Sequence, residues 1–125
     1  SVPGEITTNK SHHAFYSYDA KYLDKDGAEL IIPASLTKKQ IQTVQDLAVK
    51  VFKVLCCEGM ARVDFFLNES GEFVVNEINT IPGFTAMSMY PKLCEASGMS
   101  NKKIIDILIQ FAIKRFKTEQ KLVTK

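Results

Sequence analysis

The feature of the sequence that most constrains the fold is a pair of strand-like runs joined by a short turn signal. The first run is Arg62–Leu67, the second is Glu72–Asn79, and Asn68–Gly71 lies between them. Both runs are rich in Val, Ile and Phe, which suit a pleated, half-buried strand. Ser70-Gly71 is typical of a two-residue turn between antiparallel strands. The sequence therefore predicts a β-hairpin over Ala61–Asn79.

The register of this hairpin decides which side chains share a face. With Ser70-Gly71 as the turn, Asp64 lies opposite Glu77 and Arg62 lies opposite Asn79. Side chains alternate between the two faces of a strand, so one face is polar and the other is apolar. The polar face holds Arg62, Asp64, Phe66, Val75, Glu77 and Asn79, and the apolar face holds Val63, Phe65, Leu67, Val74 and Ile78, with Asn76 as its one polar member. A slip of one residue would move Asp64 to the face opposite Glu77.

Two opposed carboxylates are unusual in a purely structural sheet, because like charges directly across a strand pair are destabilising. A bound divalent cation removes that repulsion, and Mg²⁺ is commonly held by one or two carboxylates together with phosphate oxygens. Asp64, Glu77 and Asn79 supply such oxygens, with Arg62 as a cation beside them. The alternative is a solvated polar face on which Arg62 pairs with Asp64 or Glu77. The pattern alone leaves both interpretations open.

The segments before the hairpin predict strands followed by a helix. A short strand is expected near Val2–Thr7, and another over Glu29–Pro33, where the proline ends the run. Thr37 and Gln40 have the spacing of a capping box at the start of a helix. Gly59 is the expected end of that helix.

Two more helices are expected after the hairpin. One spans Ser88–Ala96 and is closed by Gly98, and the last is capped by Ser100. Apolar residues recur at helical spacing in Ile41–Leu55 and again in Ile104–Phe116, so we expect both stripes to lie in the core. Strands mixed with helices around one core predict a single α+β domain over the whole chain.

Composition limits the classes of partner and compartment. The formal net charge of +2 is small and the lysines are scattered, so a nucleic-acid partner is not expected. No apolar run reaches the roughly 18–20 residues that span a bilayer. The cysteines Cys56, Cys57 and Cys94 have no metal-binding spacing and cannot all pair, which indicates a reducing cytosol. The start, Ser1–Glu5, reads like the middle of a protein, so we expect an excised fragment.

Several motifs resemble the D-alanine–D-alanine ligase family of the ATP-grasp superfamily. The hairpin segments Gly59–Asp64 and Asn76–Thr85 are similar to the family patterns G-x-x-R-x-D and E-x-N-T-x-P-G-[MF]-T. The upstream Phe15–Tyr22 resembles the family loop F-Y-D-Y-x-A-K-Y, although Ser17 stands where an acid is usual. Cys56-Cys57 replaces the common Gly-Cys. The resemblance implies the C-terminal ATP-grasp subdomain, a mostly antiparallel sheet with helices packed on it.

The resemblance also implies roles for individual residues. The ligands of two Mg²⁺ (or Mn²⁺) ions would be Asp64, Glu77 and Asn79. Arg62 and Gly83 would stabilise charge on the acyl phosphate and the tetrahedral intermediate, and Ser88 and Met89 would bind the carboxylate of the second D-alanine. Lys21 and Tyr22 would belong to the loop that closes over the phosphates. Phe66 would lie under the nucleotide base.

The implied activity is ATP-dependent joining of two D-alanines through an acyl phosphate, for peptidoglycan precursors, by a cytoplasmic homodimer. The alternatives are a D-alanine–D-lactate ligase, against which Lys21-Tyr22 argues, another ATP-grasp carboxylate–amine ligase, and a non-enzymatic module that keeps only the fold. The third would be favoured by a change at Asp64, Glu77 or Asn79, and all three are present. The glycine-rich phosphate loop is absent from this sequence, so we expect the 125 residues alone to be inactive.

Overall fold

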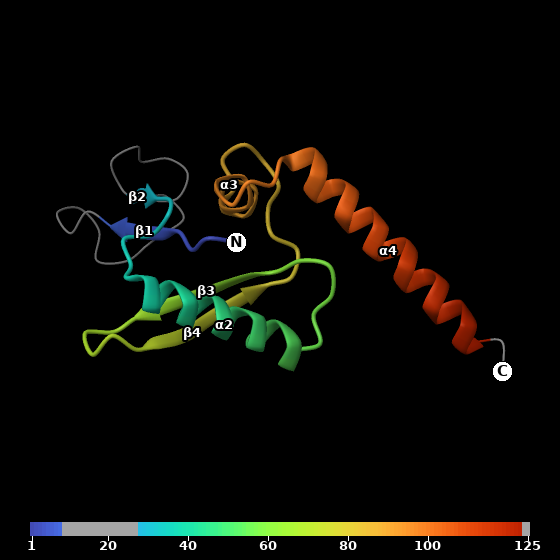
Figure 1. The fold of residues 1–125 in the computed structure, drawn as a ribbon, viewed down its shortest axis with the longest axis horizontal. Coiled ribbons are helices and arrows are strands. Elements are labelled where there is room, and N and C mark those ends of the chain that lie inside the picture. The colour runs from blue at the N-terminus through green and yellow to red at the C-terminus, as the bar shows by residue number, and fades with distance from the viewer. Residues whose placement is uncertain (9–27, 124–125) are drawn as a thin grey trace.

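The computed structural model describes residues 1–8 and 28–123 of the chain (Figure 1). The elements in chain order are β1 (Glu5–Thr8), β2 (Ala28–Ile31), α2 (Lys38–Val54), β3 (Arg62–Leu67), β4 (Phe73–Asn79), α3 (Met89–Ala96) and α4 (Asn101–Val123). The predicted α+β class is confirmed, and the elements follow the predicted order. Lys21, Tyr22 and the aromatic segment around them lie outside the described residues.

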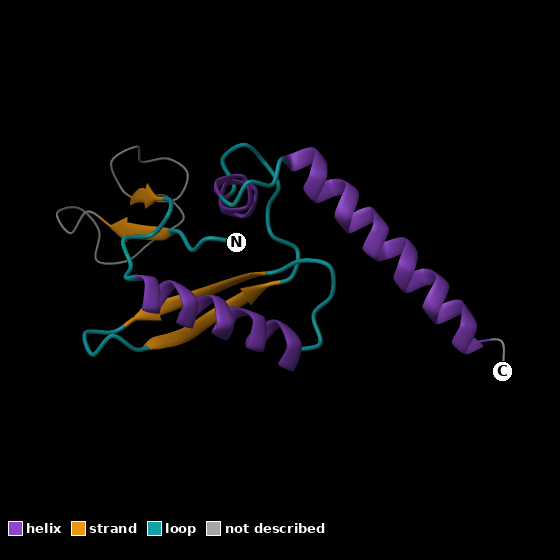
Figure 2. Ribbon diagram, viewed as in Figure 1, coloured by secondary structure: helices purple, strands orange, loops and turns teal. Residues whose placement is uncertain are grey.

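The described strands form two antiparallel pairs. β1 pairs with β2, with Glu5 opposite Ile31, and β3 pairs with β4. Helix α2 packs against β3 and lies along the hairpin in Figure 2. One face of the β3–β4 hairpin is therefore covered by a helix, and the other is available for a site.

The N-terminal residues tie β1 to the helices. The backbone N–H of Ala34 donates to the carbonyl of Pro3 over 2.9 Å, and that of Val2 donates to Ser97 Oγ over 2.8 Å. A Cβ on Gly4 would lie 2.8 Å from Leu93 Cδ2 and 3.0 Å from Met89 Cε, so a larger residue here would force these α3 side chains to shift. These contacts join the β1–β2 pair to α3.

Helix α2 begins as the sequence predicts and ends earlier. Thr37 is the N-cap, and its side chain and that of Gln40 form the complete capping box. The helix stops at Val54 and not near Gly59, because Cys56 adopts a left-handed conformation with φ 51°. The backbone N–H of Cys57 donates to the carbonyl of Phe52 over 3.0 Å, and that of Cys56 to Lys53 over 3.1 Å. This bond pattern is a Schellman motif with cysteine in the usual glycine position.

The ends of α3 and α4 agree with the predicted signals. Gly98, with φ 83°, closes α3, and Met99 donates its backbone N–H to the carbonyl of Cys94 over 3.0 Å. Ser100 Oγ accepts from the backbone N–H of Lys103 over 3.3 Å at the start of α4. Both positions were assigned from residue type and spacing alone.

The hairpin has the predicted pairing at the end that carries Arg62 and Asp64, but not at its turn. Arg62 lies opposite Asn79 and Asp64 opposite Glu77, as expected. The turn is a three-residue loop in which Gly71 has φ 83°, not a two-residue turn at Ser70-Gly71. A bulge between Asp64 and Phe65 leaves an extra residue on β4. The longer loop shifts the pairing by one residue and the bulge shifts it back, so Asp64 and Glu77 still lie opposite each other.

Between the loop and the bulge, the predicted face assignment is wrong. Phe66 lies opposite Val74, and Phe65 lies opposite Val75. Val74 therefore shares the face of Phe66, and Val75 belongs with Phe65 on the α2 side. Phe65 and Phe73 also meet edge to face, with ring centroids 6.2 Å apart.

The core of the described chain is smaller than the apolar stripes predict. Its buried side chains are Ala34, Val44, Cys94 and Ile104, together with Pro82 and Pro91. The expectation that the whole α4 stripe is core is wrong, because Ile109 and Phe116 are 50% and 60% exposed. Figure 1 shows α4 extending away from the hairpin beyond its contact with α3, which explains the exposure.

Helix α4 has a second attachment near its C-terminal half. Arg115 Nη1 lies 2.6 Å from Glu58 Oε2 in the segment between α2 and β3. None of the helices in the described ranges combines the length and apolar character needed to cross a bilayer.

Candidate functional site on the β3–β4 hairpin

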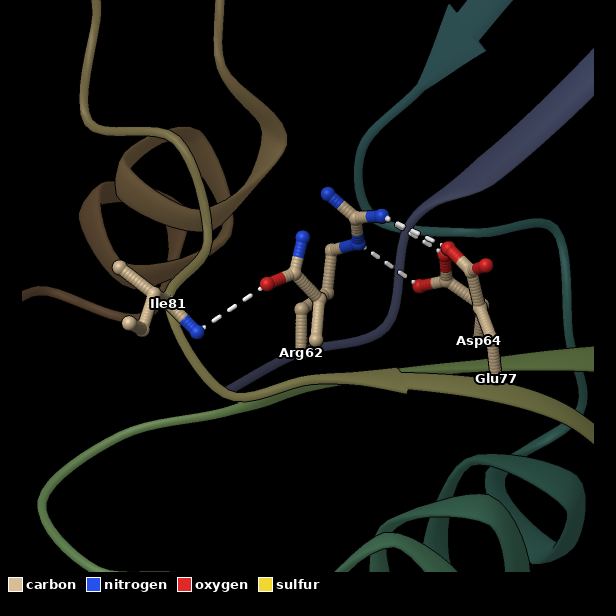
Figure 3. Close-up of polar contacts among 5 residues, drawn as sticks. Arg62, Asp64, Glu77 and Ile81 are labelled. Carbon is tan, nitrogen blue, oxygen red and sulfur yellow. Dashed lines mark hydrogen bonds and ion pairs between the residues drawn. The ribbon is translucent and has the colours of Figure 1, made fainter.

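Three charged side chains meet on the hairpin face that points away from α2. Arg62 Nε donates to Asp64 Oδ1 and Arg62 Nη2 donates to Asp64 Oδ2, each over 2.8 Å. Arg62 Nη2 also donates to Glu77 Oε1 over 3.4 Å. Figure 3 shows the three side chains on the side of the strands opposite the helix. The guanidinium therefore bridges the two opposed carboxylates.

These side chains differ in their access to solvent. The Arg62 side chain is 21% exposed, that of Asp64 is 33% exposed and that of Glu77 is 56% exposed. Ion pairs at such exposed positions contribute at most about 1 kcal/mol to stability. The pairing of Arg62 with Asp64 is what the alternative interpretation expected, yet the Glu77 carboxylate stays open toward solvent.

The oxygen atoms left on this face suit a hard cation. A carboxylate has about four lone-pair sites, and Arg62 uses two of those on Asp64. Glu77 Oε1 receives one long bond, and Asn79 Oδ1 accepts one bond, from the Ile81 backbone N–H over 3.1 Å. Free lone pairs therefore remain on Asp64, Glu77 and Asn79, the predicted ligand residues.

The protein ligands alone make only a partial metal site. Among the described residues there is no group of three or more His, Cys, Asp or Glu side chains arranged to hold a metal. Mg²⁺ usually binds one or two carboxylates and takes its other oxygens from phosphates and water. The donor set of this face fits that pattern.

The loop after β4 brings the next predicted residues together. Ser88 is the N-cap of α3, and Met89 is its first residue. A Cβ on Gly83 would lie 2.8 Å from Ser88 Oγ, so the missing side chain of Gly83 leaves the space that the Ser88 hydroxyl occupies. Gly83, Ser88 and Met89 thus share one end of α3, reached directly from Asn79 at the end of β4.

Phe66 lies further along the same hairpin face, toward the loop. Its side chain is 62% exposed, and Val74 opposite it is 52% exposed. The two form an open apolar surface next to the charged cluster, which suits the flat face of a base. The sequence predicted Val75 as the neighbour of Phe66 on this face, and the structure has Val74 there instead.

Two features of the loop were not singled out from the sequence. Thr85 contacts Ser88 through both its backbone and its hydroxyl. Tyr90 packs against Phe84, with ring centroids 6.0 Å apart. Burial, followed by the neighbouring Cys94, raises the pKa of Tyr90 to about 12. The signal for Thr85 is its three-residue spacing from Ser88 in a loop that contains Pro82.

Comparison with known proteins agrees with this geometry. Residues 1–110 match the family model described as D-ala D-ala ligase C-terminus. A D-alanine–D-alanine ligase from Shouchella clausii is 56% identical over 122 residues, which cover 98% of this chain and 32% of that relative. The chain thus spans about a third of the length of the curated relatives it matches.

Solved structures give the same result in three dimensions. The D-alanine–D-alanine ligase from Coxiella burnetii matches with a TM-score of 0.74 and 46% identity, over 77% of this chain and 28% of that one. The VanG D-Ala:D-Ser ligase from Enterococcus faecalis matches with a TM-score of 0.69 and 36% identity, over 86% of this chain and 30% of that one. The chain belongs to the D-alanine–D-alanine ligase family and corresponds to its C-terminal part.

Proposed function

We propose that this chain is the C-terminal ATP-grasp subdomain of a D-alanine–D-alanine ligase. The whole enzyme would join two D-alanines at the expense of ATP, through an acyl phosphate, to supply peptidoglycan precursors. The observation that carries the proposal is the cluster of Arg62, Asp64 and Glu77 on the hairpin face away from α2, next to the loop that holds Gly83.

The charged cluster fits the demands of phosphoryl transfer. That reaction depends mainly on positioning and on stabilising charge at the transferred group. Asp64, Glu77 and Asn79 would hold Mg²⁺, and two such ions, when bound, would neutralise charge on the ATP phosphates. Arg62 presents a planar guanidinium, which binds phosphate and carboxylate oxygens through paired hydrogen bonds. Its contacts with Asp64 and Glu77 hold that group beside the metal ligands.

The loop between β4 and α3 fits the second step, attack of an amine on the acyl phosphate. The developing oxyanion needs preorganised donors, and the backbone N–H of Gly83 would be one of them. The Ser88 hydroxyl and the N-terminal N–H of α3 at Met89 would bind the carboxylate of the second D-alanine, because helix N-termini favour anions. The closeness of Gly83 to Ser88 supports placing both groups around one small substrate.

The remaining roles follow the resemblance. Phe66 would lie under the adenine base, and its exposure beside the charged cluster supports this. Lys21 and Tyr22 would belong to the loop that closes over the phosphates and excludes water from the acyl phosphate. The free cysteines Cys56, Cys57 and Cys94 support a cytoplasmic location, and a homodimer stays a prediction from the resemblance.

The proposal is tested with the full-length protein that contains this chain. Mg²⁺-ATP and D-alanine should give D-alanine-dependent phosphate release, and mass spectrometry should identify D-alanyl-D-alanine as the product. Phosphate release that does not depend on D-alanine, or a different product, would refute the substrate assignment. The 125 residues alone should turn over poorly, and robust D-alanine-dependent ATP hydrolysis by them would refute the expectation that this part of the enzyme is inactive alone.

A second acceptor is suggested by the match to a D-Ala:D-Ser ligase, and D-lactate is the alternative raised by the sequence. A competition assay with D-alanine, D-serine and D-lactate at equal concentrations separates the three products by mass. We expect D-alanyl-D-alanine to dominate. Predominance of either mixed product would change the acceptor but leave the phosphoryl-transfer site as proposed.

A further inference from the structure

Thr85 and Ser88 form a closely bonded pair in the loop between β4 and α3. The Thr85 backbone N–H donates to Ser88 Oγ over 3.1 Å, and the two side-chain oxygens lie 2.9 Å apart in a hydrogen bond. The Ser88 backbone N–H donates in return to the Thr85 carbonyl over 3.0 Å. Two hydrogen bonds therefore fix the Ser88 side chain against Thr85, and a third joins the two backbones.

The Ser88 side chain does not perform its usual task at this position. An N-cap serine normally accepts a hydrogen bond from the second or third backbone N–H of its helix. Ser88 makes no such bond, and the third residue of α3 is Pro91, which has no N–H. The hydroxyl is turned toward Thr85 instead.

The count of lone pairs and protons then determines what Ser88 offers to a ligand. A serine hydroxyl has one O–H and two lone pairs. The Thr85 N–H occupies one lone pair of Ser88 Oγ. If the Thr85 hydroxyl donates, it occupies the second, and the only free function of Ser88 is its O–H. A carboxylate only accepts hydrogen bonds, so it selects this arrangement.

Gly83 leaves the space that the same hydroxyl occupies. A Cβ on Gly83 would come within 2.8 Å of Ser88 Oγ and 3.6 Å of Ser88 Cβ. A larger residue would push the hydroxyl out of its bonds to Thr85. The position of the Ser88 O–H thus depends on Thr85 for its direction and on Gly83 for its space.

We propose that Thr85 is a positioning residue that makes Ser88 a pure hydrogen-bond donor to the carboxylate of the acceptor D-amino acid. This inference rests on the proposed function, which places that carboxylate at Ser88. Thr85 itself would not touch the substrate. Its hydroxyl would act through the Ser88 Oγ, and its backbone N–H would remain in any side-chain variant.

The test compares Thr85→Val, Thr85→Ser and Ser88→Ala in the full-length enzyme, with the KM of the acceptor measured separately from kcat and from the KM of ATP. Thr85→Val keeps the shape and the backbone N–H but removes the hydroxyl. We expect it to raise the acceptor KM about tenfold, the effect of one weakened bond to a charged group, with the KM of ATP unchanged. Thr85→Ser should restore the acceptor KM to within about twofold of the wild type.

Two further measurements distinguish positioning from structural damage. The double variant Thr85→Val/Ser88→Ala should have the same acceptor KM as Ser88→Ala alone, because residues acting through one bond are not additive. With D-alaninamide as acceptor, which has no carboxylate, Thr85→Val should have no effect. Equal losses in every kinetic parameter, or additive effects in the double variant, would overturn the positioning role.

The role of Thr85 and the role of Ser88 can be refuted separately. If Ser88→Ala raises the acceptor KM and Thr85→Val does not, the positioning role of Thr85 is wrong and the role of Ser88 stands. If Ser88→Ala leaves the acceptor KM unchanged, the carboxylate is bound elsewhere, and the proposed function of Ser88 is wrong together with this inference.

Discussion

Asp64 and Glu77 lie opposite each other across the β3–β4 hairpin, and the Arg62 guanidinium donates to both carboxylates. Two acids in this relationship repel each other unless a cation is near. Arg62 supplies part of that compensation within the chain. The remaining lone pairs on Asp64, Glu77 and Asn79 are where we propose that a further cation from solution binds. The site is therefore defined by charge that the fold leaves only partly balanced.

Replacing Arg62 by lysine should separate the role of its charge from that of its shape. Lysine keeps the positive charge but cannot form the paired hydrogen bonds of a guanidinium. We expect Arg62→Lys to lower kcat of the full-length enzyme by about 100-fold or more, as when one preorganised donor to a developing charge is lost. Phosphate-release kinetics measure this change.

The stability of Arg62→Lys provides the control. Because the ion pairs of Arg62 are partly exposed, the free energy of unfolding should change by less than about 1 kcal/mol. Urea unfolding of the two proteins measures the difference. A kcat within a few-fold of the wild type would show that Arg62 only pairs with its neighbours.

Cys56→Gly should stabilise the protein. Cys56 occupies the left-handed position after α2, which costs an L-residue about 1–2 kcal/mol and costs glycine little. We expect a gain of roughly 0.5–1 kcal/mol in the free energy of unfolding, reduced by the greater chain entropy of glycine. Cys56→Ala is the matched control and should give no gain, since alanine has the same steric conflict. A loss of stability in Cys56→Gly would contradict the assigned cap.

Tyr90 should make stability fall at alkaline pH. Burial raises its folded-state pKa to about 12, whereas an unfolded tyrosine titrates near about 10. The contribution of the protonated Tyr90 to the free energy of unfolding is fully present below a pH of about 10. It is lost as the pH rises from about 10 toward 12, because the unfolded chain releases the proton first. Urea unfolding should therefore show a steeper loss for the wild type than for Tyr90→Phe in that range. Equal slopes for the two proteins would mean that the phenol is not buried as described.

The sequence predicted the site end of the hairpin correctly for a partly wrong reason. The predicted loop is one residue shorter than the observed one, and the bulge on β4 compensates for this difference before the strands reach Asp64 and Glu77. Loop conformation and bulges depend on backbone packing that residue types do not specify. Between these two irregularities the prediction failed, at Val74 and Val75.

The helices show the same division between local and tertiary information. Thr37 and Ser100 were found because an N-cap is a local interaction of a side chain with its own helix. The burial of the α4 stripe could not be predicted in this way, since it depends on what packs against Ile109 and Phe116. The Thr85–Ser88 pair was also missed, because the direction of the Ser88 side chain, toward Thr85 and not into α3, depends on the conformation of the loop before the helix.

The most direct test of the metal site is the Mg²⁺ dependence of D-alanine-dependent phosphate release in full-length Glu77→Gln. This change removes one charge and keeps the shape of the side chain. Glu69→Gln, at an exposed residue of the hairpin loop, is the matched control. We predict that Glu77→Gln needs at least about tenfold more Mg²⁺ for half-maximal rate, consistent with loss of one of few protein ligands, and that Glu69→Gln matches the wild type. A Mg²⁺ requirement of Glu77→Gln equal to that of the wild type would contradict the placement of the metal on this hairpin.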